Sequence, residues 1–183
     1  AVQAMVLNAL GLTGRALYLM PEYMRNKPVD LLIGEGLVAD DFNDDTLGRA
    51  LDEVQQAGVT EVFARVASNA VEVFEVEKSY AHLDTSSISL HGKYESDMAQ
   101  RAVNVFDAVE IRHGYSKEHR PDLKQVVVTL ITSQASALPF WLEVLDGNSS
   151  DKESFPQSIK AYCHQLQGET PPWFVMDSAG YSK

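Results

Sequence analysis

The chain has a single cysteine and no long hydrophobic run, and these two absences exclude several classes of protein. Among its 183 residues only Cys163 carries a thiol, so an internal disulfide is impossible, as is usual for a reducing compartment. No stretch approaches the roughly eighteen consecutive apolar residues of a membrane-spanning helix. We therefore expect no membrane span, and we interpret Cys163 as an unreactive, at least half-buried thiol.

Proline, glycine and basic residues are also scarce. The 7 prolines and 11 glycines are too few for a disordered or fibrous chain, and a hydrophobic content of 45% suffices for a buried core. Lys and Arg number 15 against 26 Asp and Glu, which gives a net charge of −11. Because free-standing nucleic-acid binders are usually basic, this balance argues against DNA binding by this chain alone. It leaves open a catalytic core whose basic surface lies in other segments.

The first part of the chain has helical periodicity. Apolar residues recur at helical spacing over residues 1–20, and the segment lacks the basic start and unbroken apolar run of a signal peptide. The best-marked helix begins at Asn43 or Asp44 and ends at Gly58. A helix is also predicted over residues 60–76. We assign residues 1–78 to an N-terminal helical region, and we interpret a start without methionine as that of a fragment or a processed chain.

Strand signals begin near Lys78. We expect residues 79–183 to form an incomplete mixed sheet in the chain order β-β-β-α-β, so the fold class is mixed α/β (α+β). A helix between two strands implies a right-handed crossover and a final strand that runs parallel within the same sheet. Trp141 and Trp173 both lie in predicted strands and are expected in the core. The predicted elements are a strand from Tyr80 that can turn back as a hairpin, strands within 123–133 and 138–148, a helix from Asp151 or Ser154 to Leu166, and a strand at 171–177.

Two aspartates stand at the ends of predicted strands. Asp84 follows the apolar start of one strand, Asp177 ends the last strand, and both are followed by small residues. Carboxylates on neighbouring strands make an oxygen site of the kind that Mg²⁺ or Mn²⁺ prefers. Two such metals can clamp the attacking and leaving oxygens of a phosphodiester. Asp84 and Asp177 are therefore the candidate catalytic and metal-binding residues.

Polar residues beside the aspartates are candidate supporting groups. His82 lies two residues before Asp84, hence on the same strand face, where we interpret it as a packed or hydrogen-bonded neighbour rather than a ligand. Thr85 and Ser86 could orient the carboxylate, bind a phosphate, or be ordinary strand hydroxyls. Ser178, next to the second aspartate, has the same open status.

A basic segment precedes the second predicted strand. Its position in a loop between strands suits contact with DNA phosphates, but a solvated loop in which Arg120 pairs with Asp122 explains it equally well. Both interpretations remain open. The candidate DNA-binding residues are Arg112, His113, Lys117, His119, Arg120 and Lys124.

Several segments resemble one known family. Three sequence segments resemble the DDE transposases of bacterial insertion sequences: LDTSSISLHGKY, HGYSKEHRPDLKQVVVTL and FVMDSAGYS. The upstream segment FNDDTLGRALDEVQQAG resembles the helical region that precedes the catalytic domain in one branch of that family. The resemblance covers essentially the whole chain, and it implies a ribonuclease-H-like catalytic domain.

The resemblance also implies a site and an activity. In the family three acidic residues bind two divalent metals; Asp84 matches the first and Asp177 the second. The third, a glutamate on a later helix, has no counterpart before Lys183, so this chain by itself is expected to be inactive. The implied enzyme is a DNA transposase that cleaves transposon ends with Mg²⁺ or Mn²⁺ and transfers strands to target DNA. Its implied partners are DNA and further copies of itself assembled on DNA, in the bacterial cytoplasm at the nucleoid, with no membrane.

Two alternatives remain open. Another ribonuclease-H-like nuclease would share the strands and differ only in substrate. A non-catalytic interaction module, derived from a truncated transposase, would bind a partner through the acidic helical half. In that second case binding of divalent ions is absent, or is unaffected by Asp84→Asn.

Overall fold

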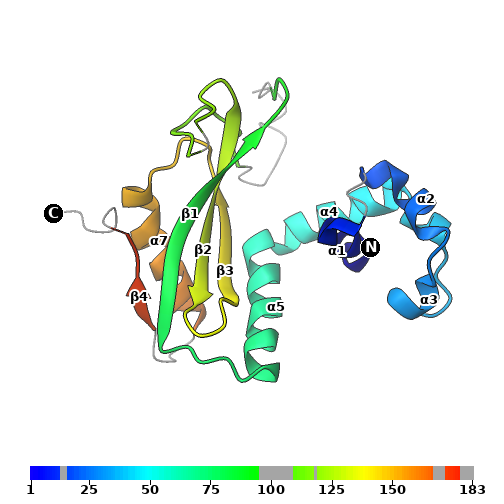
Figure 1. Cartoon of the computed structure of the whole chain (residues 1–183), viewed down its shortest axis with the longest axis horizontal. Helices are drawn as coiled ribbons and strands as arrows, with labels where there is room; N and C mark the ends of the chain where they lie inside the picture. Colours follow the sequence, from blue (N-terminus) through cyan, green and yellow to red (C-terminus); the bar gives the residue numbers. More distant parts are fainter. Residues whose placement is uncertain (13–15, 95–108, 118, 167–171, 178–183) are drawn as a thin grey trace. The chain divides into compact units, whose positions relative to one another are not determined.

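The chain folds into two compact units, formed by Ala1–Gly58 and Val59–Lys183 (Figure 1). The computed structural model describes residues 1–12, 16–94, 109–117, 119–166 and 172–177. Among the helices in these ranges, none has both the length and the apolar character that crossing a membrane requires. Each unit is described by itself below.

The first unit is built from short helices around a small core. Its predicted helical spacing over residues 1–20 is realised in pieces, and Pro21 lies in the first turn of a new helix, where its missing N–H breaks no helical hydrogen bond. The buried side chains are Ala4, Met20, Met24, Val29, Phe42 and Leu47. The elements are α1 (Val2–Leu7), the π-helical turn η1 (Asn8–Leu12), η2 (Leu17–Leu19), α2 (Met20–Met24), α3 (Val29–Leu32), η3 (Ala39–Phe42) and α4 (Asp44–Ala57).

Helix α4 begins and ends where the sequence predicts. The side-chain oxygen of Asn43 accepts a hydrogen bond of 3.0 Å from the main-chain N–H of Thr46, which satisfies one of the free donors of the first turn. Asp44 and Asp45 in that turn complement the positive end of the helix dipole. Gly58 ends the helix with a φ of 85°, a conformation that residues with a side chain rarely adopt.

The second unit is a four-stranded sheet with helices. Its strand order is β3-β2-β1-β4, with β1 antiparallel to β2, β2 antiparallel to β3, and β4 parallel to β1. The predicted order β-β-β-α-β, the mixed α+β class and the parallel last strand are thus confirmed. The elements are α5 (Val59–Val73), β1 (Tyr80–Leu90), β2 (Lys124–Ser133), β3 (Pro139–Leu145), α7 (Asp151–Gln165) and β4 (Trp173–Val175).

Strand β1 is one continuous strand, so the suggested hairpin within it is wrong. Every residue from Ala81 to Leu90 is paired with β2 in an unbroken register. The alternation of serine with Ile88 and Leu90 therefore reflects the two faces of a single strand, not a turn.

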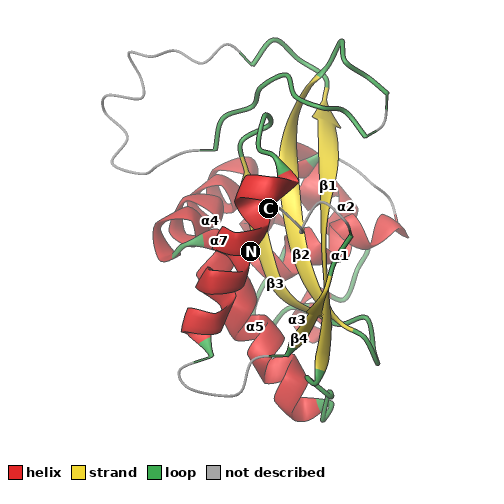
Figure 2. Cartoon of the chain, turned by 90° about the vertical axis from the view of Figure 1, so that its left-hand side faces the viewer, coloured by secondary structure: helices red, strands yellow, loops and turns green. Residues whose placement is uncertain are grey.

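The core of the second unit lies on one face of the sheet. Odd-numbered residues of β1 and β2 point to this face, where Leu83 and Ile131 pack with Phe155 of α7 and Ala64 of α5. Figure 2 shows both helices on this side of the strands. The even-numbered residues of β1 from Tyr80 to Ile88, including Asp84, are exposed. The sheet therefore separates a helix-covered face from an open one.

The two tryptophans differ in burial. Trp141 is buried as predicted, with 7% of its surface exposed. The prediction that Trp173 is a core residue is wrong, because 76% of it is exposed. Trp173 pairs with the equally outward-facing Tyr80, at the position of β4 that turns to the open face of the sheet. An apolar strand thus carries one large aromatic on the side away from the helices.

The division into units falls earlier than the change in sequence texture near Lys78. Helix α5 packs through Ala64 and Val71 on the core of the sheet, and so it belongs to the second unit. The boundary between the two units follows Gly58 in the sequence. The change in sequence texture lies between α5 and β1, inside the second unit.

Candidate metal centre

The parallel pairing of β1 with β4 ends two residues before each aspartate. Tyr80, Ala81 and His82 pair with Trp173, Phe174 and Val175. If this register is continued two residues past the end of β4, Asp177 falls opposite Asp84. Both residues are exposed, and Asp84 stands on the open face of the sheet. Since neighbouring strands lie about 4.8 Å apart, two carboxylates at matched positions can share one cation.

The main chain orients the Asp84 carboxylate. The N–H of Thr85 donates a hydrogen bond of 2.8 Å to Asp84 Oδ1. The side chain remains 79% exposed, so water or a cation reaches it freely. With Oδ1 held, Oδ2 is the oxygen that a metal would take.

The supporting residues predicted around Asp84 divide between the two faces. His82 and Ser86 are exposed on the face that carries Asp84. Thr85 points the other way and is only 2% exposed, with its hydroxyl donating to Asp151 Oδ1 over 2.6 Å. Thr85 therefore orients Asp84 through its main chain and binds α7 through its side chain. Ser178 lies outside the described residues.

A cationic side chain stands beside the site. Lys117 Nζ lies 3.9 Å from Asp84 Oδ1 and 3.8 Å from Asp151 Oδ2. It donates hydrogen bonds to the carbonyl and hydroxyl oxygens of Thr85, at 2.5 and 2.8 Å. Sequence reasoning included Lys117 in a general basic cluster and missed Asp151, because an acid in the first turn of a helix is ordinarily explained by the helix dipole.

Most of the other basic candidates already have partners. Arg112 pairs with Glu110, and the bidentate pair of Arg120 with Asp122, one of the two open interpretations, is present in the structure. Lys124 Nζ donates to the carbonyls of Lys93 and Tyr94, at 2.9 and 2.6 Å. His113 and His119 are exposed. The segment is thus largely occupied in holding its own loop, and Lys117 is the member that lies at the aspartates.

The Arg120 pair predicts a measurable pKa. Hydrogen bonding to the Arg120 guanidinium lowers the pKa of Asp122 from an ordinary 3.8 to about 2. Since the folded pKa is depressed, the pair stabilises the fold above pH 3.8 and loses that contribution as the pH falls through about 2. An NMR titration should show this value in the wild type and a return toward 3.8 in Arg120→Ala, with no change in Lys152→Ala. An unshifted wild-type titration would show that the pair does not form in solution.

The acidic set at the site is small. Over the ranges that the structure describes, no three or more His, Cys, Asp or Glu side chains gather where they could hold a metal ion. The pair Asp84 and Asp177 nevertheless fits Mg²⁺, which is commonly bound through one or two carboxylates and keeps several waters. Binding by this pair alone should be weak.

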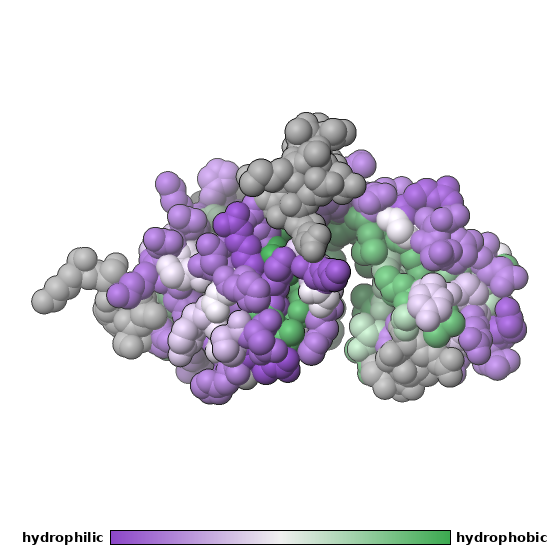
Figure 3. Space-filling model, turned by 90° about the horizontal axis from the view of Figure 1, so that it is seen from above, coloured by the Kyte–Doolittle hydropathy of each residue, from purple (hydrophilic) through white to green (hydrophobic). Residues whose placement is uncertain are grey.

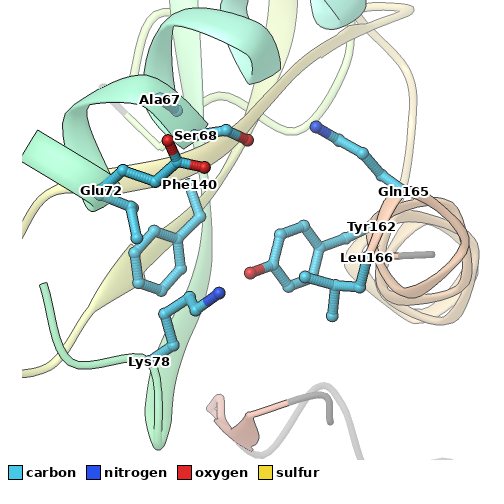
Figure 4. Close-up of a pocket in the computed structure, with 9 residues that line it drawn as sticks. Ala67, Ser68, Glu72, Lys78, Phe140, Tyr162, Gln165 and Leu166 are labelled. Carbon is cyan, nitrogen blue, oxygen red and sulfur yellow. The ribbon is translucent and has the colours of Figure 1, made fainter. Parts of the chain in front are cut away.

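Two pockets lie on the helix-covered side of the sheet. The first, of about 360 Å³, opens between α5 and α7, and Figure 4 shows the hydroxyl of Tyr162 and the amine of Lys78 directed toward one another across it. Because Tyr162 packs in the core with Leu83, this pocket lies on the opposite face from Asp84. The second, of about 330 Å³, is lined by Thr85, Lys117 and Asp151 among others, so it adjoins the candidate centre.

Comparison with known proteins gives one finding. Residues 1–68 match a family described as a domain of unknown function (DUF4277). The match covers the first compact unit and the first ten residues of α5. No curated protein and no solved structure matches the chain.

Proposed function

We propose that this chain is part of a DNA transposase, in which Asp84 and Asp177 bind divalent metal for phosphodiester cleavage at transposon ends. The observation that supports the proposal is the parallel register between β1 and β4, which, continued two residues past the end of β4, would bring Asp177 opposite Asp84. The sheet order is that of a ribonuclease-H-like domain, as the family resemblance implies. The matched domain of unknown function is found in transposase-like proteins, which agrees with this assignment.

The chemistry follows from the carboxylates. Each binds Mg²⁺ or Mn²⁺ through a hard oxygen, and two metals about 3.5–4 Å apart activate the attacking water and stabilise the leaving oxygen. The family resemblance implies that a third acidic residue, a glutamate, would complete the set. The freed 3′-hydroxyl then attacks target DNA. The enzyme works on DNA in the bacterial cytoplasm, as an oligomer assembled on the transposon ends.

Metal binding tests the proposal on the chain itself. We expect Mn²⁺ to broaden the amide NMR signals of His82, Asp84 and Asp177 first, because a paramagnetic ion relaxes nearby nuclei most strongly. Asp84→Asn and Asp177→Asn should each weaken this site about tenfold or more, since each removes one of two charged ligands.

A matched control distinguishes a specific metal site from general attraction of Mn²⁺ to an acidic protein. Asp30→Asn removes one exposed carboxylate from α3 in the other unit and should leave the broadening around Asp84 unchanged. If Mn²⁺ binds both site variants as it binds the wild type, or broadens signals elsewhere first, the metal centre is contradicted.

One observation favours a second candidate, the non-catalytic interaction module. Hydrophobic side chains lie on the surface of the helical unit, as the green areas of Figure 3 show. Leu10 is 68% exposed and Leu31 is 86% exposed, so this unit has apolar surface for a partner protein. A chain that binds a protein partner but shows no Asp84-dependent Mn²⁺ binding would support this candidate over the transposase.

A further inference from the structure

We propose that Asp151 is a positioning residue, which holds the Lys117 ammonium beside Asp84 so that Lys117 contacts the DNA phosphate bound there. This inference rests on the proposed function and adds to it two residues from segments outside the aspartate strands. Lys117 precedes β2 and Asp151 begins α7, whereas Asp84 belongs to β1. The sheet and α7 bring the three together.

The hydrogen bonds form a directed chain. The Thr85 hydroxyl donates to Asp151 Oδ1 at 2.6 Å, so its lone pairs are free to accept from Lys117 Nζ at 2.8 Å. Lys117 Nζ also donates to the Thr85 carbonyl at 2.5 Å. The Asp151 carboxylate holds the hydroxyl proton on the side away from the ammonium and also attracts the ammonium charge across 3.8 Å. Asp151 therefore controls Lys117 through Thr85.

The three side chains of this hydrogen-bond network differ in burial. Thr85 is 2% exposed, the Asp151 side chain 24% and the Lys117 side chain 41%. Exposure thus rises from the threonine to the lysine. An ammonium held by two hydrogen bonds, on a side chain that is 41% exposed, can contact a ligand at a smaller cost in conformational entropy than a freely moving lysine.

The donor count leaves one N–H for a substrate. An ammonium group has three donors, and Thr85 takes two of them. The 3.8 and 3.9 Å separations from Asp151 and Asp84 are too long for hydrogen bonds, although both carboxylates attract the charge. A phosphate oxygen held by a metal on Asp84 would be within reach of this third donor. Charge-assisted bonds of this kind are among the stronger ones in proteins.

The test measures DNA binding and Mn²⁺ binding separately. A fluorescently labelled short DNA duplex is titrated with the chain at low ionic strength, with and without Mn²⁺, and the gain in affinity caused by Mn²⁺ is the quantity compared. Lys117→Ala should reduce that gain about tenfold, the effect of one charge-assisted hydrogen bond. Its affinity for Mn²⁺ alone should be equal or higher, because a cation beside the ligand has been removed.

Asp151 is tested by non-additivity. Asp151→Ala should lower the Mn²⁺-dependent gain, and the double variant with Lys117→Ala should lose no more than Lys117→Ala alone, because Asp151 acts through Lys117. Asp151→Asn, which keeps an acceptor for Thr85, should lose less than Asp151→Ala. Lys152→Ala removes an exposed neighbouring cation and should leave the gain unchanged.

Each outcome bears on one proposal. Losses that add independently, or wild-type behaviour of Lys117→Ala, would overturn the positioning role. A parallel loss of Mn²⁺ affinity in Lys117→Ala would show local unfolding rather than a lost phosphate contact, and would also overturn it. The proposed function fails separately, if Mn²⁺ binding does not depend on Asp84.

Discussion

Gly147→Ala is expected to destabilise the second unit by about 3 kcal/mol or more, the upper range for single substitutions. A Cβ at this buried glycine would clash with the carbonyl oxygen of Gln125 and would stand 2.5 Å from that of Arg112. Both contacts are with main chain, which is fixed by the bridge between Arg112 and Gln125. The Gly147 N–H also donates to the carbonyl of Glu110 at 3.0 Å. No side-chain movement relieves such a clash.

Thermal or urea unfolding followed by circular dichroism measures this effect. Gly48→Ala is the matched control, because Gly48 lies inside α4 and a Cβ there meets nothing within 4 Å. That control should be neutral or stabilising by about 0.5–1 kcal/mol, as alanine is the better helix former. A Gly147→Ala chain that unfolds like the wild type would show that the loop packing at this glycine is wrong.

Asp84→Asn is expected to reduce strand cleavage at least about a thousandfold, or about 4 kcal/mol of activation free energy, in an enzyme that joins this chain to the third acidic residue. The amide is neutral and coordinates Mg²⁺ poorly, while its size and its oxygen are kept. Asp177→Asn should have an effect of the same order, because on the proposed function both carboxylates bind the metal. Binding to transposon ends should remain largely intact, since protein contacts to DNA phosphates do not require either carboxylate.

A gel assay of cleavage at labelled transposon ends, run beside a binding assay, separates the two effects. His82→Ala is a useful comparison, because this exposed neighbour on the same face should cost far less than either aspartate. Near-normal cleavage by Asp84→Asn or Asp177→Asn would contradict the proposed function.

Local patterns were sufficient for most of the elements. The alternation of β1, the apolar run of β2, the Asn43 cap and Gly58 each depend on residues within a few positions, so periodicity and turn chemistry predict them. The parallel last strand followed from the helix before it, through the handedness of crossovers. These two kinds of reasoning together placed Asp84 and Asp177 on neighbouring strands.

What sequence alone determined, then, was the order of the strands and the helix between the last two, because these follow from neighbours along the chain; the metal-binding role of the two carboxylates stays a prediction. Tertiary structure decided which face of β4 is covered, and so exposed Trp173. It also decided that α5 joins the sheet and that Gly147 has no room for a side chain. In the hydrogen-bond network of Asp151, Thr85 and Lys117, the hydrogen bond between Thr85 and Asp151 joins residues 66 positions apart in the sequence. No local pattern encodes such a contact, because it forms only when α7 packs on the sheet and burial forces each polar group to find a partner.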